Sequence, residues 1–177
     1  MRRIIYRVAA SLDGYIADPQ GGIDWIVHEP TIDFASLYAG IDTVLLGRRT
    51  YELTRQPGAP AWPKGWRIFL FSHTPRPTDD PGVTLVQKNS TDLVANLRSE
   101  SGGDIWLFGG GSLFASLLAA DLVDRVELAL VPVLLGGGTP LLAHAAARTK
   151  LRLTHSEAHP SGIVSLQYDV QRKVRAE

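Results

Sequence analysis

Short apolar runs alternate with polar segments rich in glycine and proline along the whole chain. The runs are short and rich in branched or aromatic side chains, which is typical of buried strands. These runs predict strands at residues 3–10, 42–46, 67–71, 83–86 and 105–108.

Other segments place apolar residues at helical spacing instead. They predict a weak helix at 31–39, a short helix at 49–54, a helix from Ser90 or Thr91 to residue 99, and a helix that buries Leu113, Leu117 and Leu118. Either Ser90 or Thr91 is a suitable N-cap residue for the third of these helices.

The last third of the chain turns to alternating apolar and polar positions. Residues 126–133 predict a strand, and residues 151–156 and 163–170 predict a hairpin around 159–162. Strands that alternate with helices indicate an α/β fold with a mostly parallel sheet and helices on both faces. The hairpin adds antiparallel strands at one edge. We expect residues 1–177 to form one domain.

The composition excludes several classes of protein. Lysine plus arginine equals aspartate plus glutamate, 18 each, so nucleic acid is not an expected partner. The chain has no cysteine, and its histidines show no metal-ligand spacing, so we expect no metal site. No apolar stretch approaches the roughly 20 residues that cross a bilayer, and the N-terminus lacks a signal-peptide pattern. A cytoplasmic location is therefore expected. The histidines are His28, His73, His144, His155 and His159.

A glycine-rich turn is the strongest chemical signal. Gly109, Gly110 and Gly111 follow the apolar strand that ends at Phe108 and open a helix with Ser112. Glycines let the backbone approach a ligand, and a helix N-terminus favours phosphate. The alternative is a tight turn without a ligand. The motif lacks the spacing of the standard dinucleotide fingerprint.

Further polar groups follow other strands. Gly47, Arg48, Arg49 and Thr50 come directly after an apolar strand, and arginine suits phosphate. A solvated basic pair is the alternative there. Ser72, after the next strand, is placed to line a nucleotide, although a plain polar loop is the simpler interpretation.

Two glycine-containing loops are less specific. Gly136 to Gly138 predict a hairpin-like loop that could also approach a cofactor. Asp13 and Gly14 predict a turn, and Trp25 follows Asp24 in an apolar loop.

Taken in order, these segments resemble the dihydrofolate-reductase-like superfamily, and within it the C-terminal reductase domain of bifunctional riboflavin-biosynthesis deaminase-reductases and its stand-alone relatives. The resemblance covers residues 3–170. The segments that carry it are 11–17, Asp24-Trp25, 46–52, Phe71-Ser72, 105–113, 122–124 and 131–141.

The resemblance implies an eight-stranded sheet and a reductase that uses NADPH. It places the 47–50 and 109–113 turns, with Phe108, Ser112 and Leu113, around the cofactor pyrophosphate. Arg48 or Arg49 and Ser72 are expected near the adenosine 2′-phosphate. The backbone at Ala9, Ala10 and Ile16 is expected to line the nicotinamide.

The chain departs from dihydrofolate reductases at two substrate positions. Their pteridine-binding carboxylate falls near Pro30 and Thr31, flanked by Glu29 and Asp33, of which Asp33 is the candidate. The nearest match to their folate-tail arginine is Trp66, with Lys64 and Arg67 beside it. The sequence also lacks the zinc deaminase domain of the riboflavin enzymes, so an already deaminated intermediate or another substrate is expected.

We therefore expect hydride transfer from NADPH to a pyrimidine-like, pterin-like or ribosylamino heterocycle, and the nearest assigned activity is 5-amino-6-(5-phosphoribosylamino)uracil reductase. Asp13 or Asp33 is expected to orient or protonate the acceptor, and Trp25 and Trp66 to contact the substrate. A homodimer is an expected assembly. Dihydrofolate reduction and a non-catalytic nucleotide-binding protein on the same fold are the alternatives.

Overall fold

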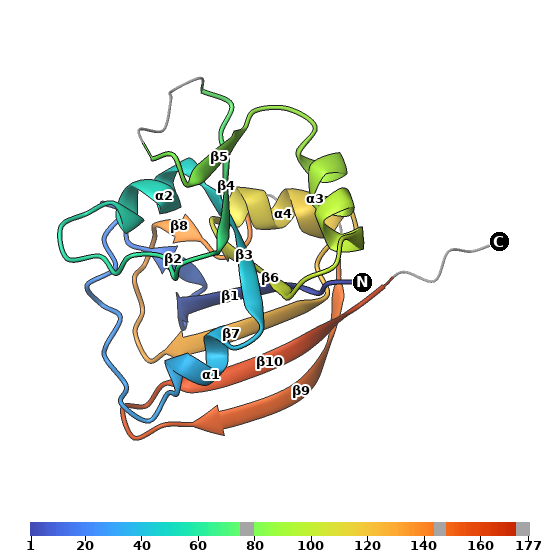
Figure 1. Cartoon of the computed structure of the whole chain (residues 1–177). Coiled ribbons are helices and arrows are strands. Elements are labelled where there is room, and N and C mark those ends of the chain that lie inside the picture. Colours follow the sequence, from blue (N-terminus) through green and yellow to red (C-terminus); the bar gives the residue numbers. More distant parts are fainter. Residues whose placement is uncertain (75–79, 144–147, 173–177) are drawn as a thin grey trace.

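The computed structural model describes residues 1–74, 80–143 and 148–172, so His144 lies outside the described residues. Eight strands form one sheet in the order β5–β4–β3–β6–β1–β7–β10–β9 (Figure 1). Neighbours from β5 to β7 are parallel, whereas β10 is antiparallel to β7 and β9. This confirms the predicted sheet. The strands are β1 (Ile4–Ser11), β3 (Ile41–Gly47), β4 (Arg67–Phe71), β5 (Val83–Val86), β6 (Asp104–Gly109), β7 (Arg125–Val131), β9 (Lys150–Ala158) and β10 (Val164–Gln171).

Helices cover both faces of the sheet, as predicted. α3 and α4 pack on one face through Leu97 and Phe114. α1 and α2 pack on the opposite face through Tyr38 and Tyr51. The helices are α1 (Phe34–Tyr38), α2 (Arg48–Thr54), α3 (Ser90–Ser99) and α4 (Gly111–Ala119).

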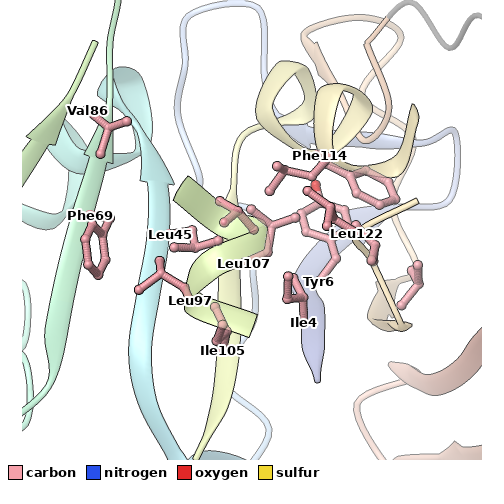
Figure 2. Packing of buried hydrophobic residues seen from close by; sticks show 14 residues of the cluster. Ile4, Tyr6, Leu45, Phe69, Val86, Leu97, Ile105, Leu107, Phe114 and Leu122 are labelled. Carbon is pink, nitrogen blue, oxygen red and sulfur yellow. The ribbon is translucent and has the colours of Figure 1, made fainter. Parts of the chain in front are cut away.

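Alternation along the central strands divides the core into two clusters. On β3, Leu45 joins the α3–α4 side, whereas Val44 and Leu46 join the other side. Figure 2 shows the α3–α4 side, where the ring of Tyr6 stacks on Phe114 with centroids 3.8 Å apart. Each fully buried large side chain contributes about 1.5–3 kcal/mol to folding, so this core holds the strand ends in fixed positions.

A second, two-stranded sheet was not predicted. It pairs β2 (Tyr15–Ala17) with β8 (Thr139–Pro140), so the 136–138 segment leads into a strand. The two strands are too short for a periodicity signal. Their approach depends on Gly138, where a Cβ atom would lie 2.1 Å from the carbonyl oxygen of Ala17.

Three predicted boundaries are corrected by the structure. α1 begins at Phe34, because the Asp33 side chain accepts a hydrogen bond from the Ser36 N–H and caps the helix there. α3 is preceded by Asn89 in the left-handed conformation, so neither Ser90 nor Thr91 is its N-cap. β7 ends at Val131, because the following proline has no N–H to donate.

The buried Arg2 side chain connects the N-terminus to the start of β3 and to the residue before β6. Its guanidinium donates to the Gly103 carbonyl at 2.6 Å, to the Thr43 hydroxyl at 2.7 Å and to the Asp42 carboxylate. Only 2% of the Arg2 side chain is exposed. All three acceptors lose the Arg2 donor if the guanidinium is removed, and the Asp42 carboxylate keeps its hydrogen bonds from the Gly103 N–H and the Thr43 hydroxyl.

We expect Arg2→Met to lower the free energy of unfolding by about 1–3 kcal/mol, because the hydrogen bonds that Arg2 makes from its buried position to Gly103, Thr43 and Asp42 are lost. Urea denaturation measures it. Arg3→Met is the matched control, since the Arg3 side chain is 53% exposed and its ion pair with Asp104 lies at the surface, where loss costs about 0–1 kcal/mol. Equal losses for the two variants would contradict the role given to Arg2.

None of the described helices has the length and apolar character needed to cross a membrane.

Candidate functional site

An open cleft of about 2310 Å³ runs along the carboxyl ends of the central parallel strands. Small-molecule pockets usually measure about 300–1,000 Å³, so this cleft has room for more than one small molecule. Ligands of parallel α/β sheets bind at this edge. The loops after β3, β4 and β6 and the aromatic side chains under α1 line it.

The glycine turn at the end of β6 borders this cleft, and the structural constraint differs at each of its three glycines. Gly109 has a φ of +138°, which side chains rarely adopt. A Cβ atom at Gly111 would lie 2.3 Å from the Pro140 carbonyl oxygen. A Cβ atom at Gly110 would meet only ordinary contacts, the nearest being the Thr50 hydroxyl at 3.5 Å. Packing therefore does not require a glycine at 110.

The N-terminus of α4 is open to the cleft. Its N-cap is Gly110, and among the residues that the structure describes no side-chain hydrogen bond caps the helix. Gly110, Gly111, Ser112 and Leu113 all line the cleft. First-turn N–H groups without a cap, together with the helix dipole, favour an anion at this position.

The turn after β3 packs directly against the glycine turn. A Cβ atom at Gly47 would lie 3.7 Å from the Gly110 nitrogen, and the Thr50 hydroxyl lies 3.6 Å from the Cβ position of Gly109. Gly47 and Thr50 also line the cleft. The structure thus brings together two segments that are about sixty residues apart in sequence because β3 and β6 are neighbours.

A basic corner adjoins these turns. The Arg48 Nε donates to the Ser72 hydroxyl at 3.0 Å, and Arg48 lies 3.8 Å from the Glu52 carboxylate. Arg49 is exposed and lines the same cleft, as Ser72 does. The Arg48 guanidinium and the Ser72 hydroxyl therefore meet at this corner, and a second arginine lines the same cleft, an arrangement suited to a phosphate group.

Two of the three residues predicted to line the nicotinamide border the cleft. Ala9 and Ile16 line the cleft, and the Ile16 Cδ1 is 4.0 Å from the Cβ position of Gly110. Ala10 is buried, with 1% of its surface exposed, and like Gly109 it is not among the lining residues.

The two predicted catalytic carboxylates do not line the cleft. Asp13 accepts hydrogen bonds from the Ser11 hydroxyl at 2.7 Å and from the Gly136 N–H at 2.7 Å, which fastens the loop before β8. Asp33 caps α1 and accepts from the Ser36 hydroxyl at 2.6 Å. In each case a serine hydroxyl is the main cause that lowers the pKa of the carboxyl. Both side chains are therefore held as carboxylates in structural hydrogen bonds.

Aromatic side chains from several elements form one wall of the cleft. Trp106 lies 4.5 Å from Phe108 and 5.1 Å from Tyr38 between ring centroids. The predicted substrate contact Trp66 belongs to this wall and lines the cleft. Trp25 does not line it, and its indole N–H donates to the Gly22 carbonyl at 3.2 Å.

Glu29 is a buried carboxylate at the cleft margin that the sequence pattern did not identify as a site residue. Glu29 is 2% exposed and accepts hydrogen bonds from the Thr31 N–H and the Ser161 N–H, each at 2.9 Å. Thr31 also contacts His159 Nδ1 at 2.9 Å. These hydrogen bonds join the loop before α1 to the β9–β10 turn. Glu29 and Thr31 are close in sequence, but their partners Ser161 and His159 are not, so the sequence pattern does not reveal the contact.

Hydrogen bonds from Ser161 and then Thr31 lower the pKa of Glu29 to about 2 from the ordinary value of 4.5. A lowered folded-state pKa adds stability above the unfolded pKa, and that stability is lost as pH falls from 4.5 towards 2. We expect Glu29→Gln to melt at a lower temperature than the parent at pH 7, and the gap to close through this window. Thermal unfolding followed by circular dichroism measures it. A gap that stays constant down to pH 2 would contradict the assignment.

The sheet order and the placement of the cleft define the dihydrofolate-reductase-like fold. Dihydrofolate reductase from Enterococcus faecalis, in complex with NADP(H) and RAB-propyl, superposes with a TM-score of 0.70 at 16% identity, over 96% of this chain and 97% of that one. The chain belongs to the RibD C-terminal domain family, which matches residues 2–165.

The chain is also similar to individual proteins in sequence and in structure. The uncharacterised protein YyaP of Bacillus subtilis strain 168 is 32% identical over 94% of each chain. A Shewanella sp. PV-4 protein named for riboflavin biosynthesis superposes with a TM-score of 0.83 at 28% identity, over 97% of this chain and all of that one. The diaminohydroxyphosphoribosylaminopyrimidine deaminase/5-amino-6-(5-phosphoribosylamino)uracil reductase of Thermotoga maritima gives 0.72 at 16% identity, over 96% of this chain and 57% of that one.

Proposed function

We propose that this protein is an NADPH-dependent reductase that acts on a pyrimidine-like, pterin-like or ribosylamino substrate, with an activity related to that of 5-amino-6-(5-phosphoribosylamino)uracil reductases. The observation that carries the proposal is the meeting of the 47–50 and 109–113 turns in one cleft, where Gly110 is free of any packing constraint. Membership of the RibD C-terminal domain family supports a reductase.

The residues present fit a phosphorylated dinucleotide. A side chain at Gly110 would fill the space in front of the uncapped α4 N-terminus, so this turn would hold the pyrophosphate. Arg48, Arg49 and Ser72 would hold the 2′-phosphate. Ala9 and Ile16 would line the nicotinamide, because both line the cleft and Ile16 lies beside the glycine turn.

The side chains around the reacting atoms would act by holding the cofactor and the acceptor in place. NADPH, when bound, supplies the hydride that reduces the acceptor. The aromatic wall of Tyr38, Trp66 and Trp106 would hold the acceptor ring and exclude water. Since Asp13 and Asp33 are held as carboxylates outside the cleft, we assign the proton of the reaction to water.

Turnover tests the proposal. Loss of NADPH absorbance is followed with 5-amino-6-(5-phosphoribosylamino)uracil or dihydrofolate as the acceptor. We expect turnover with the uracil compound and little with dihydrofolate, because Trp66 is the nearest match in sequence to the arginine that holds the folate tail in dihydrofolate reductases. Turnover with dihydrofolate alone would assign the chain to dihydrofolate reductases. Tight NADPH binding without turnover of any heterocycle would indicate a non-catalytic nucleotide-binding protein.

A further inference from the structure

The floor of the cleft beside the proposed nicotinamide position is polar, although its walls are aromatic. Ala9, Ala129 and Ser165 are register partners on β1, β7 and β10 and form one row. The next row consists of Arg7, Glu127 and Gln167. Side chains two residues apart on a strand face the same side, so both rows face the same space, and all six residues line the cleft.

Glu127 has hydrogen-bonding capacity left over. Its Oε2 accepts from the Arg7 Nε at 2.6 Å. Its Oε1 lies 3.8 Å from the Arg125 guanidinium, which is longer than a hydrogen bond. The side chain is only 8% exposed. This carboxylate oxygen of a largely buried residue borders the cleft without a hydrogen bond from the described residues, so it is available to accept from a ligand N–H.

The neighbouring Gln167 has its whole amide available. Among the described residues none hydrogen-bonds to this side chain, although it borders the cleft. Directly opposed side chains on antiparallel strands stand roughly 5 Å apart at Cβ. An acceptor on Glu127 therefore stands beside an amide that can donate to a carbonyl oxygen.

We infer that Glu127 and Gln167 bind the edge of a neutral heterocycle in which a ring N–H lies next to a carbonyl, as in a cyclic amide or ureide. This inference rests on the proposed function, whose substrate class it specifies. Glu127 would accept from the ring N–H, and Gln167 would donate to the carbonyl oxygen. The aromatic rings of Tyr38, Trp66 and Trp106 would contact the ligand ring from the cleft wall.

The charge of the floor favours a neutral ring over an anion. The Arg7 guanidinium is paired with Glu127, and it also donates to the Leu37 carbonyl. The second row of the floor therefore carries no net charge. An anionic group placed against Glu127 would be repelled by the carboxylate, whereas an N–H group would be attracted to it.

The test is binding of 5,6-diaminouracil to the protein saturated with NADP⁺, measured by calorimetry. Ribitol, which offers only sugar hydroxyls, is the second probe. The first variant is Gln167→Leu, which removes the amide and breaks no side-chain hydrogen bond among the described residues. Glu157→Gln is the matched control, because Glu157 lies on the same face one strand further out, is exposed and does not line the cleft.

We expect Gln167→Leu to weaken diaminouracil binding by about tenfold, the value of one ligand hydrogen bond, and Glu157→Gln to leave it unchanged. Glu127→Gln should weaken it as well, and its thermal unfolding shows whether Arg7 tolerates the loss. Equal affinity for parent and Gln167→Leu would overturn the inference. So would ribitol binding that depends on Gln167, or no diaminouracil binding at all to protein that binds NADP⁺. Failure to bind the nucleotide would instead refute the proposed function.

Discussion

Replacing Arg48 and Arg49 together by alanine should weaken NADPH binding by about 10- to 100-fold and leave NADH binding almost unchanged. Charge-assisted hydrogen bonds contribute about 1.5–3 kcal/mol, and a factor of ten in affinity corresponds to about 1.4 kcal/mol. The two cofactors differ only in the 2′-phosphate. Arg48 is already oriented by its hydrogen bond to Ser72, so its guanidinium is held at the cleft before any ligand binds.

Fluorescence titration of the parent and the double variant with each cofactor measures this effect. Arg55→Ala is the matched control, because Arg55 follows α2, pairs with Asp80 at 3.2 Å and does not line the cleft. It should leave both affinities unchanged. Equal losses of NADPH and NADH affinity in the double variant would show that the basic corner does not hold the 2′-phosphate.

Gly110→Ala should fold normally and lose cofactor binding, whereas Gly111→Ala should lose stability. At Gly110 the backbone has a φ of −92°, and an added methyl group meets nothing closer than 3.5 Å. That methyl group would occupy the space assigned to the pyrophosphate, and overpacking of this kind costs about 1–3 kcal/mol. We expect about 10- to 100-fold weaker binding of both NADPH and NADH.

At Gly111 the methyl group would lie 2.3 Å from the Pro140 carbonyl oxygen, which is backbone and cannot move aside alone. Its stability should fall by about 1–3 kcal/mol or more. Thermal unfolding and cofactor titration of both variants separate the two roles. If Gly110→Ala binds NADPH as the parent does, the glycine turn serves only the fold.

The large sheet can be predicted from the sequence because each of its strands coincides with a local pattern of apolar residues. β4 and β5 begin and end where the apolar runs do. The small β2–β8 sheet depends instead on contacts across the chain, such as the approach of Gly138 to Ala17. Two- and three-residue strands have no periodicity of their own, so a sequence pattern does not reveal them.

The same distinction separates the parts of the candidate site. The 109–111 and 47–50 turns are contiguous motifs, and the structure brings both to the cleft. The carboxylates were harder to interpret, because Asp13 and Asp33 resemble candidates in sequence but are engaged by Ser11 and Ser36. Glu127 and Gln167 come together only through the register of β7 with β10, which no single segment of sequence specifies.

The most direct test of NADPH binding in the cleft is titration of the purified protein with NADPH and with NADH, followed by tryptophan fluorescence. Trp62, Trp66 and Trp106 line the cleft, so a bound nicotinamide should quench them. We expect saturable quenching by NADPH and binding of NADH weaker by about 10- to 100-fold. No binding of either cofactor would contradict it, and the glycine turns would then be elements of the fold alone.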